Sequence, residues 1–372
     1  MIVVTILSQF VLYVSLSVLM GSFIMRLIPT SLKPDISLST KWIYASLWSI
    51  PIVTFAPILQ LLAILTKQFG LFPSLLKIVT NYQVGHSWLA TVVLMLILAA
   101  LVKVSENRTS HMFTVIYLFI LTAIIAAIAF ASHAHAMGSS AGFFIDFIHL
   151  FAFSIWVGIL LQVSFFTTSY ANWEAFLKWF SPTAIVALTA VALSGIFLTE
   201  TIVPDYITGW SSPYGHWLFI KHVLLMPLIF IIFANGVLIK LQLAKPNFNP
   251  TIWTKLEAVL LLLILLVTAI FSEHQPPMPF VQTDNVSLLI QWMLSMPLED
   301  GMTGHFQMNG IGVIFFILTA VFIGLFIVSF IKRAPLIIPI LLCLAMTICF
   351  YMGIMSITVF NFIGYCIPQH VH

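Results

Sequence analysis

The stretch MFTVIYLFILTAIIAAIAFASHA, residues 112–134, decides the fold class of this chain. It contains no Asp, Glu, Lys or Arg. An α-helix of about 20 apolar residues crosses the ~30 Å hydrocarbon core of a bilayer, because each residue adds about 1.5 Å of length. The stretch is therefore long enough and apolar enough to form a membrane-spanning helix.

The composition extends this conclusion to the whole chain of 372 residues. Hydrophobic residues make up 61% and charged residues only 7%, whereas soluble domains carry about 25% charged residues. A cytosolic enzyme, a disulfide-stapled secreted domain and a disordered regulator are thereby excluded. The net charge of +3 is too small to indicate nucleic-acid binding. Three cysteines without a C-x-x-C motif disfavour a disulfide framework.

Further apolar stretches predict an all-α integral membrane protein, a bundle of about ten transmembrane helices. The first begins without a basic region or a cleavage site, so we expect a retained span rather than a signal peptide. Segment 286–298 is too short to span and is typical of an interfacial amphipathic helix. The predicted spans are 2–28, 42–66, 84–104, 112–134, 142–168, 175–199, 216–241, 252–272, 308–331 and 335–361.

The lysines and arginines predict the orientation, because short cytoplasmic loops carry an excess of them. With both termini outside, eleven of the fourteen basic residues lie in cytoplasmic loops. The exceptions are Lys67, Lys77 and Lys221, and the loop 67–83 is the one that argues against this orientation. We expect a multi-pass protein of the cytoplasmic membrane, in contact with the lipid bilayer.

This orientation gathers ten of the eleven histidines in or near the outer half of the membrane, and only His111 lies on the cytoplasmic side. The outer loops also carry methionines. Imidazole and thioether groups suit copper, and thioethers favour Cu(I). Each residue alone is compatible with a structural role, but the one-sided set favours a copper-collecting surface. The candidate metal ligands are His133, His135, Met137, His149, His216 and His222.

The spacing of these histidines along the chain indicates which of them could bind the same metal ion. His133 and His135 would diverge on a helix but share a face in an extended stretch, which we expect near Gly138. His216 and His222 each need partners from other helices. We place a copper site between the fifth and seventh spans, near His149 and His222, fed by loops 133–142, 200–216 and 273–307. The supporting residues are Asp146 and Glu200, which would tune the ligands, Trp156, which would exclude water, and the intramembrane Lys221 and Asn235.

Sulfur atoms recur every three residues along the last span, where neighbours at this spacing touch on a helix. They could form a Cu(I) relay, but an ordinary apolar stripe is the favoured interpretation. The residues are Cys343, Met346, Cys349, Met352 and Met355.

Several short pieces, in order, resemble the copper resistance protein D (CopD) family, which includes fusions of the YcnJ type. They are SHAHAMG at 132–138, HLFAFSIWVG at 149–158, Phe180-Ser181, Ser194-Gly195, Tyr214-Gly215, Lys221, Asn235, Leu256-Glu257 and Pro276-Pro277. Lys255 departs from the arginine expected beside Glu257. The resemblance implies three regions: an N-terminal four-helix region at 1–132, a CopD-like core at 133–281 and an outer segment with two helices at 282–372.

The resemblance also implies copper uptake or transfer across the cytoplasmic membrane, with the copper ion as ligand. This chain carries no soluble copper-binding domain of the kind fused to some relatives, so we expect a separate extracytoplasmic copper carrier protein. The tail His370-Val371-His372 is a candidate receiving site. No P-loop and no Asp-Lys-Thr-Gly motif is present, so a transporter driven by a gradient is favoured over an enzyme.

Two other functions stay open at this point. Paired histidines on neighbouring spans also hold haem b in membrane cytochromes, so His149 and His222 could be haem ligands of a quinone- or copper-linked redox protein. A structural or assembly factor without a ligand is the weaker alternative. The direction of copper movement and its oxidation state are not predictable from these residues.

Overall fold

The structure is a computed structural model that describes residues 2–105, 110–136, 140–233, 235–236, 249–293, 297–332, 334–335 and 337–362. It confirms an all-α architecture. Ten helices in the described ranges are long and apolar enough to cross a membrane, and each falls on a predicted span. The chain divides into two compact units, described separately below: unit 1 is Met1–Thr201 with Ile231–Ala269, and unit 2 is Ile202–Phe230 with Ile270–His372.

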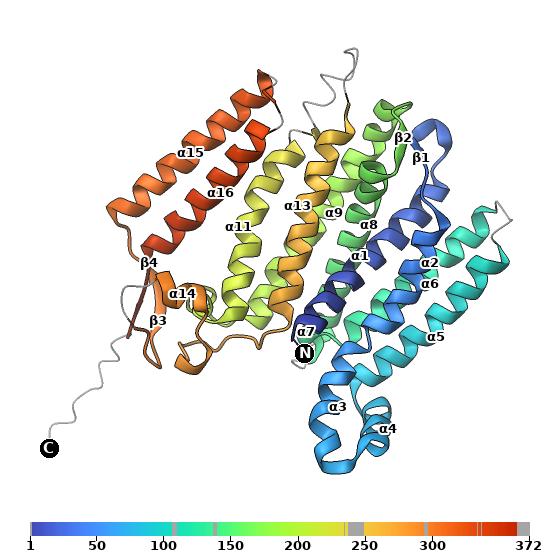
Figure 1. Cartoon of the computed structure of the whole chain (residues 1–372), viewed down its shortest axis with the longest axis horizontal. Coiled ribbons are helices and arrows are strands. Elements are labelled where there is room, and N and C mark those ends of the chain that lie inside the picture. The colour runs from blue at the N-terminus through green and yellow to red at the C-terminus, as the bar shows by residue number, and fades with distance from the viewer. Residues whose placement is uncertain are drawn as a thin grey trace. The chain divides into compact units, whose positions relative to one another are not determined.

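Unit 1 holds the N-terminal helices and most of α13 (Figure 1). Strands β1 and β2 pair antiparallel, with Asp35 opposite Ser169. The elements are α1 (Ile2–Leu27), β1 (Asp35–Ile36), α2 (Thr40–Val53), α3 (Ala56–Phe69), α4 (Leu71–Asn81), α5 (Gln83–Val104), α6 (His111–Phe130), α7 (His133–Ala136), α8 (Ser140–Phe165), β2 (Thr167–Ser169), α9 (Trp173–Ile202) and α13 (Thr251–Ser272).

Two glycines bring α1 and α8 together. A Cβ on Gly158 would lie 2.2 Å from the carbonyl oxygen of Ser17, and a Cβ on Gly21 would lie 2.2 Å from that of Gly158. Small residues allow such backbone contact between membrane helices. The amide of Gln162 adds a hydrogen bond to the hydroxyl of Ser22, 3.0 Å away. The two helices can therefore pack at a distance that no larger residue at this crossing would permit.

The second predicted span is interrupted in the structure. Helix α2 ends at Val53 and α3 begins at Ala56, with Pro57 at its start. A proline lacks the N–H group that would continue the preceding helix, which favours a break here. The loop predicted at 67–83 contains the helix α4. Within this loop, the ammonium group of Lys77 lies 4.3 Å from the centre of the Phe69 ring.

Unit 2 contains α10, most of α11, and the C-terminal helices and strands (Figure 1). Helices α15 and α16 pack along each other, and β3 pairs antiparallel with β4, with His305 opposite Val359. The elements are α10 (Tyr206–Gly209), α11 (Pro213–Phe233), α14 (Leu288–Met293), β3 (Thr303–Phe306), α15 (Gly310–Ile331), α16 (Ile337–Ile357) and β4 (Thr358–Asn361).

Two boundary predictions in unit 2 need correction. The last span was expected to stay helical to residue 361, but α16 ends at Ile357 and the next four residues pair with β3. β-Branched and aromatic residues at 358–360 favour this strand. The amphipathic helix expected at 286–298 is helical only over Leu288–Met293 within the described residues. The two units are defined by contacts between helices, so they do not test the three regions expected from the family resemblance. Those three regions remain a prediction.

Candidate functional site

The buried imidazole of His216 is the best-defined candidate ligand in unit 2. His216 lies in the first turn of α11 and its exposed fraction is 0%. The turn is tight, because a Cβ on Gly215 would lie 2.0 Å from the carbonyl oxygen of Gly209. The Tyr214-Gly215 pair therefore has a structural reason: glycine lets the start of α11 reach the end of α10.

Two hydrogen bonds connect His216 to a methionine. Nε2 of His216 lies 2.9 Å from Oη of Tyr351 on α16, and this hydroxyl donates to Sδ of Met293 over 3.3 Å. The phenolic O–H could also donate to a neutral imidazole nitrogen, which is a stronger acceptor than a thioether. The direction of the bond between Tyr351 and Nε2 of His216 therefore depends on which ring nitrogen carries the proton.

Nδ1 of His216 is buried and has no hydrogen-bond partner among the residues that the structure describes. A buried polar atom left unpaired costs about 1–3 kcal/mol. A neutral imidazole nitrogen with a free lone pair is also the form that binds a metal ion. Nδ1 of His216 is therefore a candidate metal ligand in the tautomer that carries the ring proton on Nε2.

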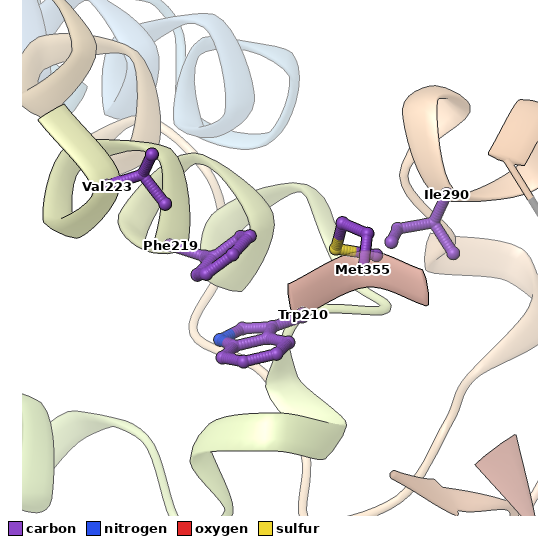
Figure 2. Packing of buried hydrophobic residues seen from close by; sticks show 5 residues of the cluster. All are labelled: Trp210, Phe219, Val223, Ile290 and Met355. Atoms are coloured by element: carbon purple, nitrogen blue, oxygen red, sulfur yellow. The ribbon is translucent and has the colours of Figure 1, made fainter. Parts of the chain in front are cut away.

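Aromatic rings and a second thioether surround this part of α11. The rings of Trp210 and Phe219 stack with centroids 4.2 Å apart, and Phe219 also stacks on Tyr351. Met355, one turn beyond Tyr351 on α16, is 4% exposed and belongs to the same buried cluster (Figure 2). Neutral imidazole and thioether groups in such apolar surroundings suit Cu(I) better than a hard cation.

His222, the second candidate on α11, makes a different contact. Its Nδ1 lies 2.5 Å from the hydroxyl of Tyr206. Burial raises the pKa of Tyr206 to about 12, so the phenol stays protonated at physiological pH. The neighbouring Lys221 places its ammonium group 5.4 Å from the centre of the Phe271 ring, as in a cation–π contact.

His149 lies in unit 1, where its Nδ1 is 3.0 Å from the hydroxyl of Ser194 on α9. The Ser194 hydroxyl donates to the carbonyl of Ala190 over 2.5 Å, so His149 donates from Nδ1. A Cβ on Gly195 would meet Cε1 of His149 at 3.4 Å. The Ser194-Gly195 pair therefore orients this ring and leaves room for it. His149 and His222 belong to different units, and a shared site for them stays a prediction.

The extended stretch expected near Gly138 lies outside the described residues, and His133 and His135 themselves are helical. Both residues lie in the short helix α7, where side chains two apart point in different directions. His133 is exposed, whereas the ring of His135 packs 4.9 Å from Phe130. Met137 lies outside the described residues. Within the described ranges, no group of three or more His, Cys, Asp and Glu side chains could hold a metal ion.

The supporting residues Asn235 and Trp156 both lie beside Glu257, which was not among the candidate site residues. Asn235 donates from Nδ2 to Oε2 of Glu257 over 2.6 Å, and the indole of Trp156 lies close to the same carboxyl. The roles expected for Asp146 and Glu200 stay predictions.

Sequence reasoning also missed Tyr206 and Tyr351, because no spacing rule connects either of them to a distant histidine. Of the sulfur-bearing residues on α16, three are buried: Cys343, Met346 and Met355.

Comparisons with known proteins fit this picture. The model of the family "Copper resistance protein D" matches residues 174–271, and the model "Copper resistance protein D-like, N-terminal domain" matches residues 1–143. The second match covers helices α1 to α7. No solved structure gives a significant match.

A curated relative is the copper transport protein CutJ of Bacillus subtilis (strain 168). It is 26% identical over 214 residues, which cover 54% of this chain and 39% of the relative. The chain thus aligns with about two fifths of that protein. Neither the family descriptions nor the relative's name refers to haem, and no contact among the described residues favours the haem alternative. Two family models that match different parts of the chain, together with this relative, show that the chain is similar to copper resistance protein D and to copper transport protein CutJ.

Proposed function

We propose that this copper-related membrane protein takes up copper from the outer side of the cytoplasmic membrane and transfers it across. The similarity to copper resistance protein D and ten apolar helices in the described ranges support a multi-pass membrane protein that handles copper. The finer proposal is that His and Met side chains of unit 2 bind the metal, and that His216 is the central ligand. A copper carrier protein on the outer side remains part of the proposal.

The main observation behind this proposal is that the buried Nδ1 atom of His216 has no hydrogen-bond partner among the described residues. The hydrogen bonds through Tyr351 hold the ring in one orientation, and the thioethers of Met293 and Met355 lie in the same cluster. Cu(I) is soft and forms bonds to imidazole and thioether groups. A hard cation such as Mg²⁺ requires oxygen ligands, and no carboxylate takes part in these contacts.

Replacing His216 by glutamine tests this proposal directly. The Nε2 amide of glutamine can still donate to Tyr351, but it has no counterpart of Nδ1, so the ligand is lost while the packing is kept. His111→Gln, an exposed histidine at the start of α6, is the matched control. We expect His216→Gln to weaken Cu(I) binding at least about tenfold, which equals about 1.4 kcal/mol.

Binding is measured on the purified protein in detergent, by competition with a chromogenic Cu(I) chelator. Transport is measured in proteoliposomes that contain a Cu(I) indicator. A membrane potential of 100 mV favours inward movement of one positive charge by about 2.3 kcal/mol, so an imposed negative interior should speed uptake. Equal Cu(I) affinity of the wild-type protein and His216→Gln would exclude His216 as a ligand. An absorption spectrum with a Soret band would instead support the haem alternative.

A further inference from the structure

A carboxyl group of unit 1 lies inside a candidate membrane span, and no cation among the described residues forms a salt bridge with it. Glu257 is 5% exposed and sits six residues after the start of α13 at Thr251. This separation corresponds to about 9 Å along the helix axis. The helix is a candidate membrane span, and its first residues face the side predicted to be cytoplasmic. Ionisable groups at such depth are costly and indicate a function.

The groups that contact the carboxyl of Glu257 within the described ranges are neutral. Asn235, two residues after the end of α11, donates to the carboxyl over 2.6 Å, and it donates to the carbonyl of Trp253 over 3.3 Å. From α8, the indole N–H of Trp156 lies close to the carboxyl without completing a hydrogen bond. No lysine, arginine or histidine in the described ranges forms a salt bridge with Glu257. On its own helix, Lys255 is two residues away and points to another face.

Oδ1 of Asn235 is buried and has no hydrogen-bond partner within the described part of the chain. An ionised carboxylate can only accept hydrogen bonds, so the charged form of Glu257 adds no donor to this pair. A protonated carboxyl has one O–H donor, and it removes an uncompensated charge from the membrane interior. One carboxyl and one amide are too few ligands for a metal ion, whereas a single proton is held by the carboxyl alone.

We propose that Glu257, positioned by Asn235, is a proton-binding site that releases its proton towards the cytoplasmic side when copper is transferred. The step breaks one O–H bond of the carboxyl, and water on that side takes up the proton, so no electrons move. The coupling to copper rests on the proposed function, but the proton site itself does not.

Infrared spectroscopy of the purified, copper-free protein tests the proton site. The wild-type protein should show the C=O band of a protonated carboxyl that disappears as the pH is raised. Glu257→Gln keeps the shape of the side chain and should remove this band. Glu174→Gln is the matched control, because Glu174 is exposed and pairs with Lys178 at 3.0 Å. Asn235→Leu should move the band to higher frequency, since the carboxyl loses a hydrogen-bond donor.

Two spectroscopic results would overturn the proton site. One is a band that is unchanged in Glu257→Gln. The other is the absence of any protonated-carboxyl band from the wild-type protein across the accessible pH range, because Glu257 would then be permanently ionised.

Copper uptake into proteoliposomes at several internal pH values tests the coupling. The wild-type rate should depend on internal pH, and Glu257→Gln should be at least about tenfold slower and independent of pH. The same pH dependence in both proteins would refute the coupling. If the wild-type protein takes up no copper at any pH, the proposed transport fails, while the infrared result still decides whether Glu257 binds a proton.

Discussion

Replacing Gly158 by alanine tests whether the close approach of α1 and α8 stabilises unit 1. The new Cβ would lie 2.2 Å from the carbonyl oxygen of Ser17, whereas an ordinary C···O contact begins at about 3.3 Å. The helices must therefore separate by roughly 1 Å, because both groups belong to the backbone and no side-chain rotation relieves the contact. Overpacking of this kind costs about 1–3 kcal/mol. We expect a loss of stability near the upper end of that range.

Thermal and denaturant unfolding of the detergent-solubilised protein, followed by tryptophan fluorescence, measures this loss. Gly324→Ala on α15 is the matched control, since no atom lies within 4 Å of its added Cβ. Alanine is favoured over glycine inside a helix by about 0.5–1 kcal/mol, so this control should be neutral or slightly more stable. A Gly158→Ala protein as stable as Gly324→Ala would refute the argument that this crossing requires glycine.

Two further predictions concern the contact between Gly195 and His149 and the hydrogen bonds between Thr283 and Asp300. Gly195→Ala should be tolerated, because its Cβ would meet His149 at 3.4 Å, an ordinary contact, whereas Gly195→Val should displace the ring and reduce copper uptake. Equal uptake by both variants would contradict this role. Hydrogen bonds from the N–H and hydroxyl of Thr283 hold the pKa of Asp300 below its usual value. Their stabilisation is present at neutral pH and is lost as the pH falls through the lowered pKa of the folded protein. Asp300→Ala should therefore speed limited proteolysis near Thr283 at pH 7, and an unchanged cleavage rate would count against it.

The apolar stretches allowed the number and approximate position of the spans to be predicted, because crossing a bilayer imposes a length that can be counted along the sequence. The breaks within and after spans were harder to predict. The interruption between Val53 and Ala56 depends on local backbone geometry. The end of α16 at Ile357 depends on β4 pairing with a strand about 50 residues earlier. Neither feature changes the hydropathy of the segment in which it lies.

The candidate site was only partly predictable. A histidine such as His216 could be selected by its place near a membrane surface, but the two residues that fix its ring lie far along the chain. Tyr351 has no marked sequence context, and Met293 was only one of several methionines in the outer loops. Asn235 and Glu257 were both part of the family resemblance, yet the hydrogen bond between them became visible only in the structure. A short motif can indicate that a residue is important, but it does not indicate which other residues the side chain contacts.

The charges of the two proposed sites explain why a proton site would accompany a copper site. The imidazole and thioether groups around His216 are neutral, so Cu(I) bound to them carries one positive charge into apolar surroundings. A net charge in such surroundings is costly unless another charge compensates it. When Glu257 loses its proton, the membrane-embedded part of the protein gains one negative charge, and its net charge stays constant as copper arrives. Exchange of one proton for one Cu(I) would therefore keep the net charge of the membrane-embedded part unchanged. On this argument, Glu257→Gln should slow copper transfer while leaving Cu(I) affinity at the outer side less affected than His216→Gln does.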